Sequence, residues 1–494
     1  MLLSFDYHSS EDYANFIKLK SLPSYSWKGR MAVVPDAYAH MFTSNKPDAK
    51  HHEPRLGKHL FDYQRDIAAT AIRKKKYAIF AECGLGKTLI MLEFAKHTAK
   101  HAGKTLIVSP LMVIPQTIAE AERFYPRMKI GQVAAADLQY WLNSDDPFDS
   151  EIGITNYEAI REGISAGNLK AICLDEASLL KSHYGAWGER LIEMGAGLEY
   201  KLTMTGTPAP NDRIEYANQA VFVDAVRTTN EFLARYFVNR GETQNRWEIK
   251  PHALRPFYRD MSHWCIFLNN PSTYGWKDNC DTIPPIHVHI DSIPLTDEQR
   301  KASQEMTGNL FVNEIGGIGQ RGKLSQMAKG KNGMPTNKPE FIRKLVESWP
   351  NESTIIWCRY NDEQDSMERV FPGAASIRGD TPIEERIRLV NDFKTGATRI
   401  LISKPKILGF GLNLQIATRH VFSGLQDSYE EFHHAVKRSN RIGSTMPLNV
   451  HIPVTELEEP MIQTVLRKAH RVEMDAAEQE LEFKRSRFSE ATDE

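Results

Sequence analysis

The sequence predicts an α/β protein with two domains in tandem, each built around a parallel β-sheet. Short apolar runs that end in small or polar residues recur between residues 77 and 208, and helix-like segments such as 88–102 lie between several of them. A second series of the same kind runs from residue 353 to residue 424. Buried strands that alternate with helices form parallel sheets covered on both faces. The two series therefore indicate two copies of one architecture.

The predicted strands are only a few residues long. The first series consists of YAIFAEC (77–83), KTLIVSP (104–110), EIGITNY (151–157), KAICLDEAS (170–178) and YKLTMTGTP (200–208). The second series consists of STIIWCRY (353–360), GAASIRGD (373–380), TRILISKP (398–405) and RHVFSG (419–424). The pattern breaks between them, where helical stretches, aromatic residues and a glycine-rich run predict a mainly helical insertion.

These changes in pattern divide the chain into five parts. They are an N-terminal accessory segment (1–55), a first lobe (56–225), a helical insertion or linker (226–335), a second lobe (336–455) and a charged helical tail (456–494). A length of 494 residues leaves room for about three units of domain size, each with its own core.

Composition excludes several classes of protein. The formal net charge is −1, so there is no overall basic field and any contact with nucleic acid must be local. The five cysteines form no C-x-x-C pair, which argues against a zinc site or a disulfide framework and favours a reducing compartment. We find neither a secretory signal nor an apolar stretch of about 18 residues. We therefore expect a cytoplasmic protein without a membrane partner.

The segment AECGLGKT (81–88) predicts a phosphate-binding loop. The preceding apolar run would be the strand that carries the chain to the edge of the sheet. Gly84 and Gly86 would allow backbone N–H groups to approach phosphate oxygens. A helix that begins near Lys87 would direct its positive end toward the anion. Taken alone, the segment is also compatible with a glycine turn that binds nothing.

Two adjacent acids, Asp175 and Glu176, end another apolar run of the first lobe. A carboxylate at such a place can hold Mg²⁺ through water, and its neighbour can orient or deprotonate an attacking water. An exposed acidic turn is the alternative for any Asp-Glu pair. The position after a buried strand, downstream of a phosphate loop, favours the catalytic interpretation.

Together these segments resemble the motifs of helicase superfamily 2, whose phosphate loop has the form A-x-x-G-x-G-K-[ST]. Ala81, Gly84, Gly86, Lys87 and Thr88 fit this form, which accounts for an alanine where the common loop has glycine. Further motifs follow in the order of the family. In the first lobe they are LFDYQRDIA (60–68), TLIVSPLMVIPQTIAE (105–120), ITNYEAI (154–160), LDEASLLKS (174–182) and LTMTGTPAPND (202–212).

The second lobe continues the resemblance. Its motifs are STIIWCRYND (353–362), IRGDTPIEERIRLVNDF (377–393), SKPKILGFGLNLQIATRHVF (403–422) and HHAVKRSNRIGS (433–444). The G-L-N-L and R-I-G forms are similar to the Swi/Snf-like branch, and the compact chain is similar to prokaryotic or phage members. Ser178, His434 and Ser444 depart from the residues usual at their positions.

The resemblance implies two RecA-like lobes that use ATP and Mg²⁺. It assigns roles residue by residue: Gln64 reads adenine, Gly84, Gly86, Lys87, Thr88 and Asp175 bind the nucleotide, and Thr88 and Asp175 hold Mg²⁺. Glu176 would activate water, and Arg438 and Arg441 would neutralise charge on the transferred phosphoryl group. Thr205, Gly206 and Thr207 would couple the lobe to nucleic acid, and the end of a strand without this role is the alternative for them.

Duplex DNA is the partner that the resemblance implies. The candidate phosphate contacts are Ser109, Thr155, Arg378, Gly409 and Asn413. Such contacts position a protein on the backbone without reading sequence. For Arg378, and for the nearby Arg359, a solvated surface arginine is an equal alternative.

The function expected is that of an ATP-dependent DNA translocase with nucleic-acid-stimulated ATPase activity. A strand-separating helicase is the nearest alternative, and an RNA-dependent motor fits the second-lobe motifs less well. A motor subunit for a separate nuclease or methyltransferase in restriction or replication is another. A decayed, non-catalytic DNA-binding subunit is opposed by the intact Lys87, Asp175, Glu176, Arg438 and Arg441.

Two further features have structural explanations. His287 and His289 alternate on one predicted strand and could bind a metal, although a surface pair is the more common arrangement. The aromatic cluster in residues 262–276 is better explained by packing than by base stacking.

Overall fold

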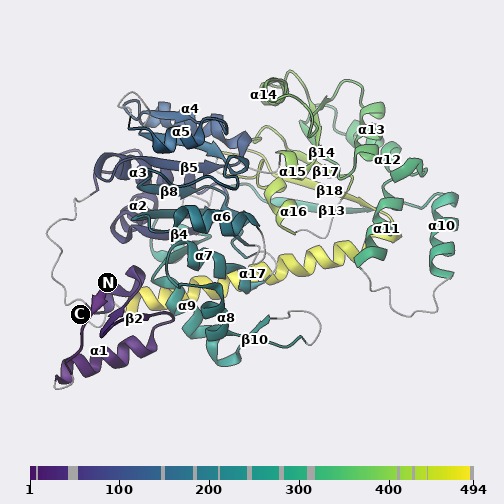
Figure 1. The fold of residues 1–494 in the computed structure, drawn as a ribbon. Helices are drawn as coiled ribbons and strands as arrows, with labels where there is room; N and C mark the ends of the chain where they lie inside the picture. Colours follow the sequence, from purple (N-terminus) through teal and green to yellow (C-terminus); the bar gives the residue numbers. More distant parts are fainter. Residues whose placement is uncertain are drawn as a thin grey trace. The chain divides into compact units, whose positions relative to one another are not determined.

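The computed structural model divides into two compact units. It describes residues 1–6, 9–42, 54–145, 151–181, 186–209, 212–241, 247–277, 283–308, 318–408, 412–424, 429–441 and 443–489. The first unit contains residues 1–278 and 474–494, and the second contains residues 279–473. Each is described by itself below, with the element labels of Figure 1.

The first unit is built on a seven-stranded sheet with the order β12-β4-β9-β8-β5-β7-β6. Every neighbouring pair in it is parallel. The strands are β4 (Lys76–Ala81), β5 (Thr105–Ser109), β6 (Ile130–Gln132), β7 (Ile152–Asn156), β8 (Ala171–Leu174), β9 (Tyr200–Thr205) and β12 (Cys265–Leu268). All residues of β5, β8, β9 and β12 are buried, which explains the mainly apolar character of β5, β8 and β12.

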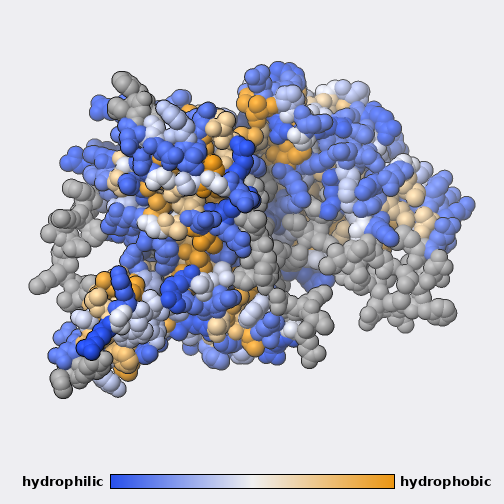
Figure 2. Space-filling view, in the orientation of Figure 1, coloured by the Kyte–Doolittle hydropathy of each residue, from blue (hydrophilic) through white to orange (hydrophobic). Residues whose placement is uncertain are grey.

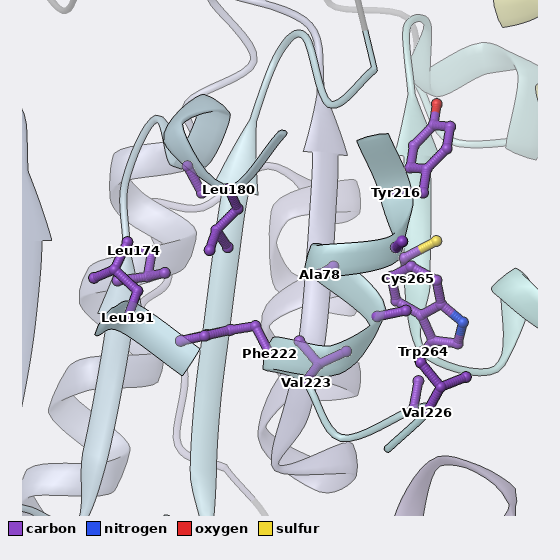
Figure 3. Close-up of a cluster of buried hydrophobic side chains, with 14 of the residues drawn as sticks. Ala78, Leu174, Leu180, Leu191, Tyr216, Phe222, Val223, Val226, Trp264 and Cys265 are labelled. Carbon is purple, nitrogen blue, oxygen red and sulfur yellow. The ribbon is translucent and has the colours of Figure 1, made fainter. Parts of the chain in front are cut away.

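Helices pack on this sheet and join its strands. They are α2 (Asp62–Lys74), α3 (Lys87–His101), α4 (Ile114–Phe124), α5 (Leu138–Asn143), α6 (Ala186–Gly195), α7 (Tyr216–Phe222), α8 (Thr229–Tyr236) and α9 (Leu254–Ser262). Figure 3 shows Phe222 of α7 between Leu174 of β8 and Val223, within the core cluster that also contains Leu191 of α6. The seven parallel strands and their helices confirm the predicted α/β class for the first lobe.

Residues assigned from the sequence to the insertion contribute to this core. Cys265–Leu268 forms β12 and pairs with β4 in parallel, at the edge of the sheet. Trp264 is 2% exposed, and its ring centroid lies 6.2 Å from that of Phe80 in β4. Packing is therefore the role of Trp264 in the aromatic cluster 262–276, as predicted. A short hairpin of β10 (Phe237–Asn239) and β11 (Trp247–Ile249) lies between α8 and α9.

The N-terminal segment forms a small antiparallel sheet of order β1-β3-β2, with a helix. Its elements are β1 (Leu2–Leu3), α1 (Ser10–Ser21), β2 (Ser26–Lys28) and β3 (Met31–Val33). Polar contacts attach it to the rest of the first unit. Asp36 pairs with Lys76 at the start of β4 at 2.8 Å, and the Ser24 hydroxyl donates to Glu231 at 2.7 Å. The segment thus lies at the end of the sheet opposite to the phosphate loop.

The second unit contains a six-stranded sheet of order β13-β18-β17-β14-β16-β15. All of its neighbouring pairs are parallel. The strands are β13 (Ile286–Ser292), β14 (Thr354–Trp357), β15 (Ala375–Ser376), β16 (Ile400–Ser403), β17 (Arg419–Phe422) and β18 (Leu448–Val454). The helices are α10 (Asp297–Gly308), α11 (Ile318–Ala328), α12 (Lys338–Glu347), α13 (Asn361–Val370), α14 (Ile383–Lys394), α15 (Pro405–Leu408) and α16 (Tyr429–Val436). The second parallel sheet confirms the tandem architecture.

Strand β13 also derives from the range assigned to the insertion. His289 on this strand stacks on His451 of β18 with ring centroids 4.6 Å apart, and its Nε2 lies 3.0 Å from the Asn449 side-chain oxygen. The pair His287 and His289 thus sits on an edge strand beside a histidine and an amide, which agrees with a surface role.

A buried ion cluster fixes the carboxyl end of the second sheet. The Lys338 ammonium donates to the carbonyls of Ser423 and Pro453 at 2.9 and 3.0 Å and lies 2.7 Å from Glu458. Lys329 lies 3.6 Å from the same carboxylate. All three charged side chains are at least 96% buried. Burial opposes the charged form of Glu458, but the two lysines hold its pKa below the ordinary value.

A long helix, α17 (Glu459–Ser489), ends the described chain. It agrees with the helical tail expected from the sequence. Among the described residues no helix combines the length and the apolar character needed to cross a bilayer. Figure 2 shows mainly hydrophilic side chains on the visible faces, as a charged fraction of 25% leads one to expect.

We predict that Glu458→Gln strongly destabilises the second unit. The substitution leaves two buried ammonium groups without a carboxylate, and breaking a buried ion pair from one side costs about 3–5 kcal/mol. Amide hydrogen exchange of β17 and β18 would measure the loss. Glu456→Gln, two residues away and exposed, is the matched control. Equal stabilities of the two variants would contradict the structural role assigned to the buried Glu458 carboxylate.

Candidate nucleotide-binding site

The phosphate loop joins β4 to α3 with two glycines in the left-handed region. Gly84 has φ of 91°, and Gly86, the residue before the helix, has φ of 69°. Residues other than glycine rarely adopt such backbone angles. The loop thereby presents the N-terminus of α3, with its unsatisfied backbone N–H groups, at the carboxyl edge of the sheet.

Gln64, the predicted adenine reader, packs directly against this loop. Its side-chain oxygen accepts from the Phe61 N–H at 3.0 Å, and its Nε2 donates to the Leu85 carbonyl at 3.2 Å. The Tyr63 hydroxyl donates to the same carbonyl at 3.0 Å. A Cβ on Gly86 would lie 2.3 Å from Gln64 Nε2 and would displace that amide, while the positive φ itself favours glycine. Gln64 thus links α2 to the loop, and adenine recognition stays a prediction.

Lys87 opens α3 and points back along its own loop. Its ammonium donates to the Ala81 carbonyl at 2.8 Å and approaches the Glu82 carbonyl at 3.4 Å. The side chain is only 9% exposed. These carbonyls hold the charge at the mouth of the loop, where a phosphate would be a stronger partner. Thr88, the next residue, lies in the first turn of the same helix.

Asp175 and Glu176 follow β8, two strands away from β4 in the sheet. The Ser109 hydroxyl donates to the Asp175 carboxylate at 3.1 Å, and the Tyr157 hydroxyl donates to the Asp175 carbonyl at 2.7 Å. Glu176 has φ of 50°, an uncommon angle for a residue with a side chain. Both acids are more than 90% buried.

The electrostatics of this pair fit a divalent cation. Burial and the neighbouring Glu176 charge raise the pKa of Asp175 to about 7, while Lys87 and the Ser109 hydroxyl oppose the rise. Two carboxylates that repel each other in a dry site are stabilised by a positive ion. Asp175 and Thr88 offer the oxygen ligands that Mg²⁺ prefers. The residues present therefore suit Mg²⁺ bound with a nucleotide.

The predicted coupling residues lie against the phosphate loop. Thr205 ends β9, and its hydroxyl accepts from the Thr207 N–H at 3.1 Å. A Cβ on Gly206 would lie 3.4 Å from the Ala81 carbonyl oxygen and 3.6 Å from the Lys87 ammonium. The segments that follow the carboxyl ends of β4, β8 and β9 are far apart in the sequence and are thus brought together.

Gln219 of α7 belongs to this site but carries no sequence motif. It is fully buried; its side-chain oxygen accepts from the Thr203 hydroxyl at 2.6 Å and its Nε2 donates to the Ala177 carbonyl at 3.1 Å. Gln219 therefore joins β9 to the residue that follows Glu176. Two adjacent buried amides, Asn218 and Gln219, in the helix YANQAVF are the signal that could have indicated it.

The two predicted arginines lie in the second unit, after α16. Arg438 is 3% exposed; its Nε donates to the His434 carbonyl at 3.0 Å, and its own carbonyl accepts from the Leu414 N–H at 2.9 Å. Arg441 is half-buried; burial lowers the pKa of Lys394, and the positive charge of Arg441 adds to this effect. The segment 438–441 is thereby held against the G-L-N-L segment of the same unit.

The candidate DNA contacts differ in accessibility. Ser109 and Thr155 are buried, with their hydroxyls bonded to Asp175 and to the Val133 carbonyl. Arg378 pairs with Asp365 and with Glu368, the latter at 2.7 Å. Asn413 is half-buried, and Gly409 lies outside the described residues. Contact with DNA through these residues stays a prediction, and for Ser109 and Thr155 it would involve the backbone.

Comparisons with known proteins agree with this geometry. Residues 72–333 match the family described as SNF2-related domain, and residues 337–443 match the helicase conserved C-terminal domain. The chain is 24% identical to the mouse protein named DNA annealing helicase and endonuclease ZRANB3 over 449 residues, which cover 84% of this chain and 40% of the mouse protein.

Two other relatives come from fission yeast and from a phage. The chain is 28% identical over 457 residues to ATP-dependent helicase fft1 of Schizosaccharomyces pombe, covering 76% of this chain and 48% of the yeast protein. It is 23% identical over 394 residues to putative protein p41 of Acyrthosiphon pisum secondary endosymbiont phage 1, covering 72% of this chain and 82% of the phage protein. The chain spans about two fifths of the length of the mouse relative.

A solved structure is also similar. It is the Sulfolobus solfataricus SWI2/SNF2 ATPase core in complex with dsDNA, at 18% identity and a TM-score of 0.39, covering 87% of this chain and 96% of that one. The family assignment rests on the sequence matches. The SNF2-related domain covers more than half of the chain and the helicase C-terminal domain follows it, so the chain belongs to the Snf2-like family of helicase superfamily 2.

Proposed function

We propose that the chain is a DNA translocase that hydrolyses ATP and is stimulated by duplex DNA. One observation carries the proposal: Lys87, Asp175 and Gly206 converge at one edge of the first sheet. The Lys87 charge acts on the Asp175 carboxyl, and a Cβ on Gly206 would lie 3.6 Å from the Lys87 ammonium. The Lys87 ammonium, the acid pair that contains Asp175 and the backbone at Gly206 are thus within reach of one bound phosphate chain.

ATP would bind with its phosphates at the N-terminus of α3. Lys87 then exchanges its hydrogen bonds to the Ala81 and Glu82 carbonyls for charge-assisted bonds to phosphate oxygens. Thr88 and Asp175 would hold a magnesium ion, which would supply positive charge to these phosphates. Ser109 keeps the Asp175 carboxylate oriented toward the site through its hydrogen bond.

Glu176 is the residue we assign to the attacking water. The uncommon φ of 50° fixes the backbone that carries it, directly after Asp175. Arg438 and Arg441 are assigned to the phosphoryl group in the transition state, where an arginine contributes about 10³–10⁵ in rate in related phosphate-loop enzymes. Gly206 responds to the state of the loop because it lies on the Ala81 carbonyl and the Lys87 ammonium.

DNA is proposed as the partner because the chain belongs to a family whose mouse member is named a DNA annealing helicase. Movement along the duplex, without strand separation, remains the leading activity, and unwinding is the alternative that the first experiment distinguishes. A separate nuclease or methyltransferase partner receives no support from the comparisons.

ATP turnover should rise strongly with duplex DNA and fall in two variants. Lys87→Ala removes the charge that binds phosphate, and Glu176→Gln removes the base, so we expect each to lose at least about 100-fold in turnover. Turnover would be measured with no nucleic acid, duplex DNA, single-stranded DNA and RNA. Stimulation by RNA alone would contradict the proposal, and stimulation by single strands alone would favour unwinding.

Gly86→Ala should lower ATP affinity by at least about tenfold. Alanine is strained at the positive φ of this position, and its Cβ would displace the Gln64 amide, which lies 2.3 Å away and bonds to the loop. Equilibrium binding of a fluorescent ATP analogue would measure the change. Gly373→Ala is the control, because nothing lies within 4 Å of its added Cβ. If Gly86→Ala left the affinity for ATP unchanged, the assignment of this loop to the nucleotide site would be wrong.

Gln219→Met should lower ATP turnover about tenfold while ATP affinity stays within about twofold. Methionine fills a similar volume but cannot bond to the Thr203 hydroxyl or the Ala177 carbonyl, so the segment after Glu176 loses its support. Steady-state kinetics and nucleotide binding together separate the two effects. If affinity and turnover fell in parallel, Gln219 would be a general stabiliser of the fold and not a positioning residue.

A further inference from the structure

A basic groove lies on α3, away from its phosphate-loop end. It has a volume of about 550 Å³ and is bounded by α3 and by the segment that precedes α2. Its charged and imidazole side chains are Arg55, Glu93, Lys96, His97, Lys100 and His101. Neither the family motifs nor the proposed nucleotide site uses any of them.

One buried carboxylate builds the groove. Glu93 is fully buried; it accepts from the Gly57 N–H at 2.7 Å and pairs with Lys96. The first bond attaches the segment 54–57 to α3. A Cβ on Gly57 would lie 2.8 Å from the Glu93 carboxylate and 2.4 Å from the His59 ring, so glycine permits this close approach. The single negative charge of the groove is therefore occupied in holding its two walls together.

The remaining cations face solvent. Arg55 and Lys100 are exposed, and within the part of the chain that the structure describes neither has an ion-pair partner. Lys100 and His101 lie in the last turn of α3, where the helix dipole favours positive charge. The dipole does not account for Arg55, which reaches the groove from a different segment. Two independent segments thus place positive charge on one concavity in a chain whose net charge is −1.

The groove is separate from the nucleotide site. Lys100 lies 13 positions after Lys87 on α3, which corresponds to roughly 20 Å along the helix axis. The groove begins nearer to the loop, because Glu93 lies 6 positions after Lys87, or roughly 9 Å along the axis, but none of its residues belongs to the phosphate loop or to the acid pair. We therefore treat a ligand of the groove as distinct from the nucleotide: a second polyanion or a different part of the DNA.

We propose that this groove binds backbone phosphates of duplex DNA, as a contact additional to those of the helicase motifs. The inference rests on the proposed DNA binding. Arg55 and Lys100 each contact a phosphate, and Glu93 positions the wall that carries Arg55. Such contacts carry no sequence information. The affinity that they add falls as the salt concentration rises, because less free energy is then gained by releasing counterions from the DNA.

The test is the salt dependence of DNA binding by the full chain. Arg55→Ala with Lys100→Ala removes two phosphate contacts, so the slope of log affinity against log salt should become less steep by about 1.8. Fluorescence anisotropy of a labelled duplex at several salt concentrations measures it. Arg55→Lys with Lys100→Arg keeps both charges and should retain the slope. The matched control is Lys344→Ala with Arg369→Ala, two exposed cations of the second unit.

The outcomes separate this inference from the proposed function. If the unaltered chain binds no duplex, the proposed function fails and the groove with it. If it binds duplex and the Arg55/Lys100 variant keeps the slope, or loses no more than the Lys344/Arg369 control, the groove is not a DNA contact. Calorimetry with inorganic tripolyphosphate is the second arm. Binding of that ion, lost in the variant while the DNA slope is unchanged, would assign the groove to a small polyphosphate and overturn the proposal.

Discussion

The parallel pairing of β4, β9 and β8 is the constraint on which the site of the first unit depends. Neighbouring strands lie about 4.8 Å apart. The order β4-β9-β8 therefore places the phosphate loop, Thr205–Thr207 and Asp175–Glu176 side by side at one edge. These segments are separated by tens of residues in the chain, and their carboxyl ends meet because all three strands point the same way. A change of register in either pair would move the Lys87 ammonium away from Gly206 and weaken its effect on Asp175.

Buried charge is arranged by one principle in both units, but with different outcomes. In the second unit Lys338 and Lys329 hold the pKa of Glu458 below its ordinary value, although burial lowers the pKa of Lys329 itself to about 8, and this paired cluster serves structure. In the first unit Asp175 and Glu176 repel each other, and the single Lys87 charge does not offset the cost, since the pKa of Asp175 rises to about 7. A cation bound with a phosphate chain would offset the remaining repulsion between the two carboxylates. Perturbed acids in this setting are typical of functional sites, whereas the cluster around Glu458 shows that burial alone is not sufficient.

The sequence predicts those parts of the fold and site that are encoded within short segments. The apolar runs that became β4, β5, β8 and β9, the glycines of the phosphate loop and the acid pair are all visible within a few residues. The edge strands β12 and β13 were assigned to a helical insertion, because their place in the sheets is decided by pairing with β4 and β18 and not by their own pattern. Gln219 and Tyr157 were not predicted for the same reason. Each acts through a backbone carbonyl or a hydroxyl of a distant segment, and such a partner has no signature in the sequence.

The hydrogen bonds of Lys87 explain how the loop could report its occupancy. In the present state the ammonium is bonded to the Ala81 carbonyl, and a Cβ on Gly206 would touch both that oxygen and the ammonium. When Lys87 turns to a phosphate, the carbonyl loses its donor and the space beside Gly206 changes. Thr205 and Thr207 are joined by a hydrogen bond across Gly206, so a shift of this residue moves the end of β9 as one piece. Gln219 bonds to Thr203 of β9 and to Ala177 at once, so a movement of β9 would act through it on the residue that follows Glu176. Four hydrogen bonds and the close approach of Gly206 to the loop thus form the path by which phosphate binding would act on the proposed base.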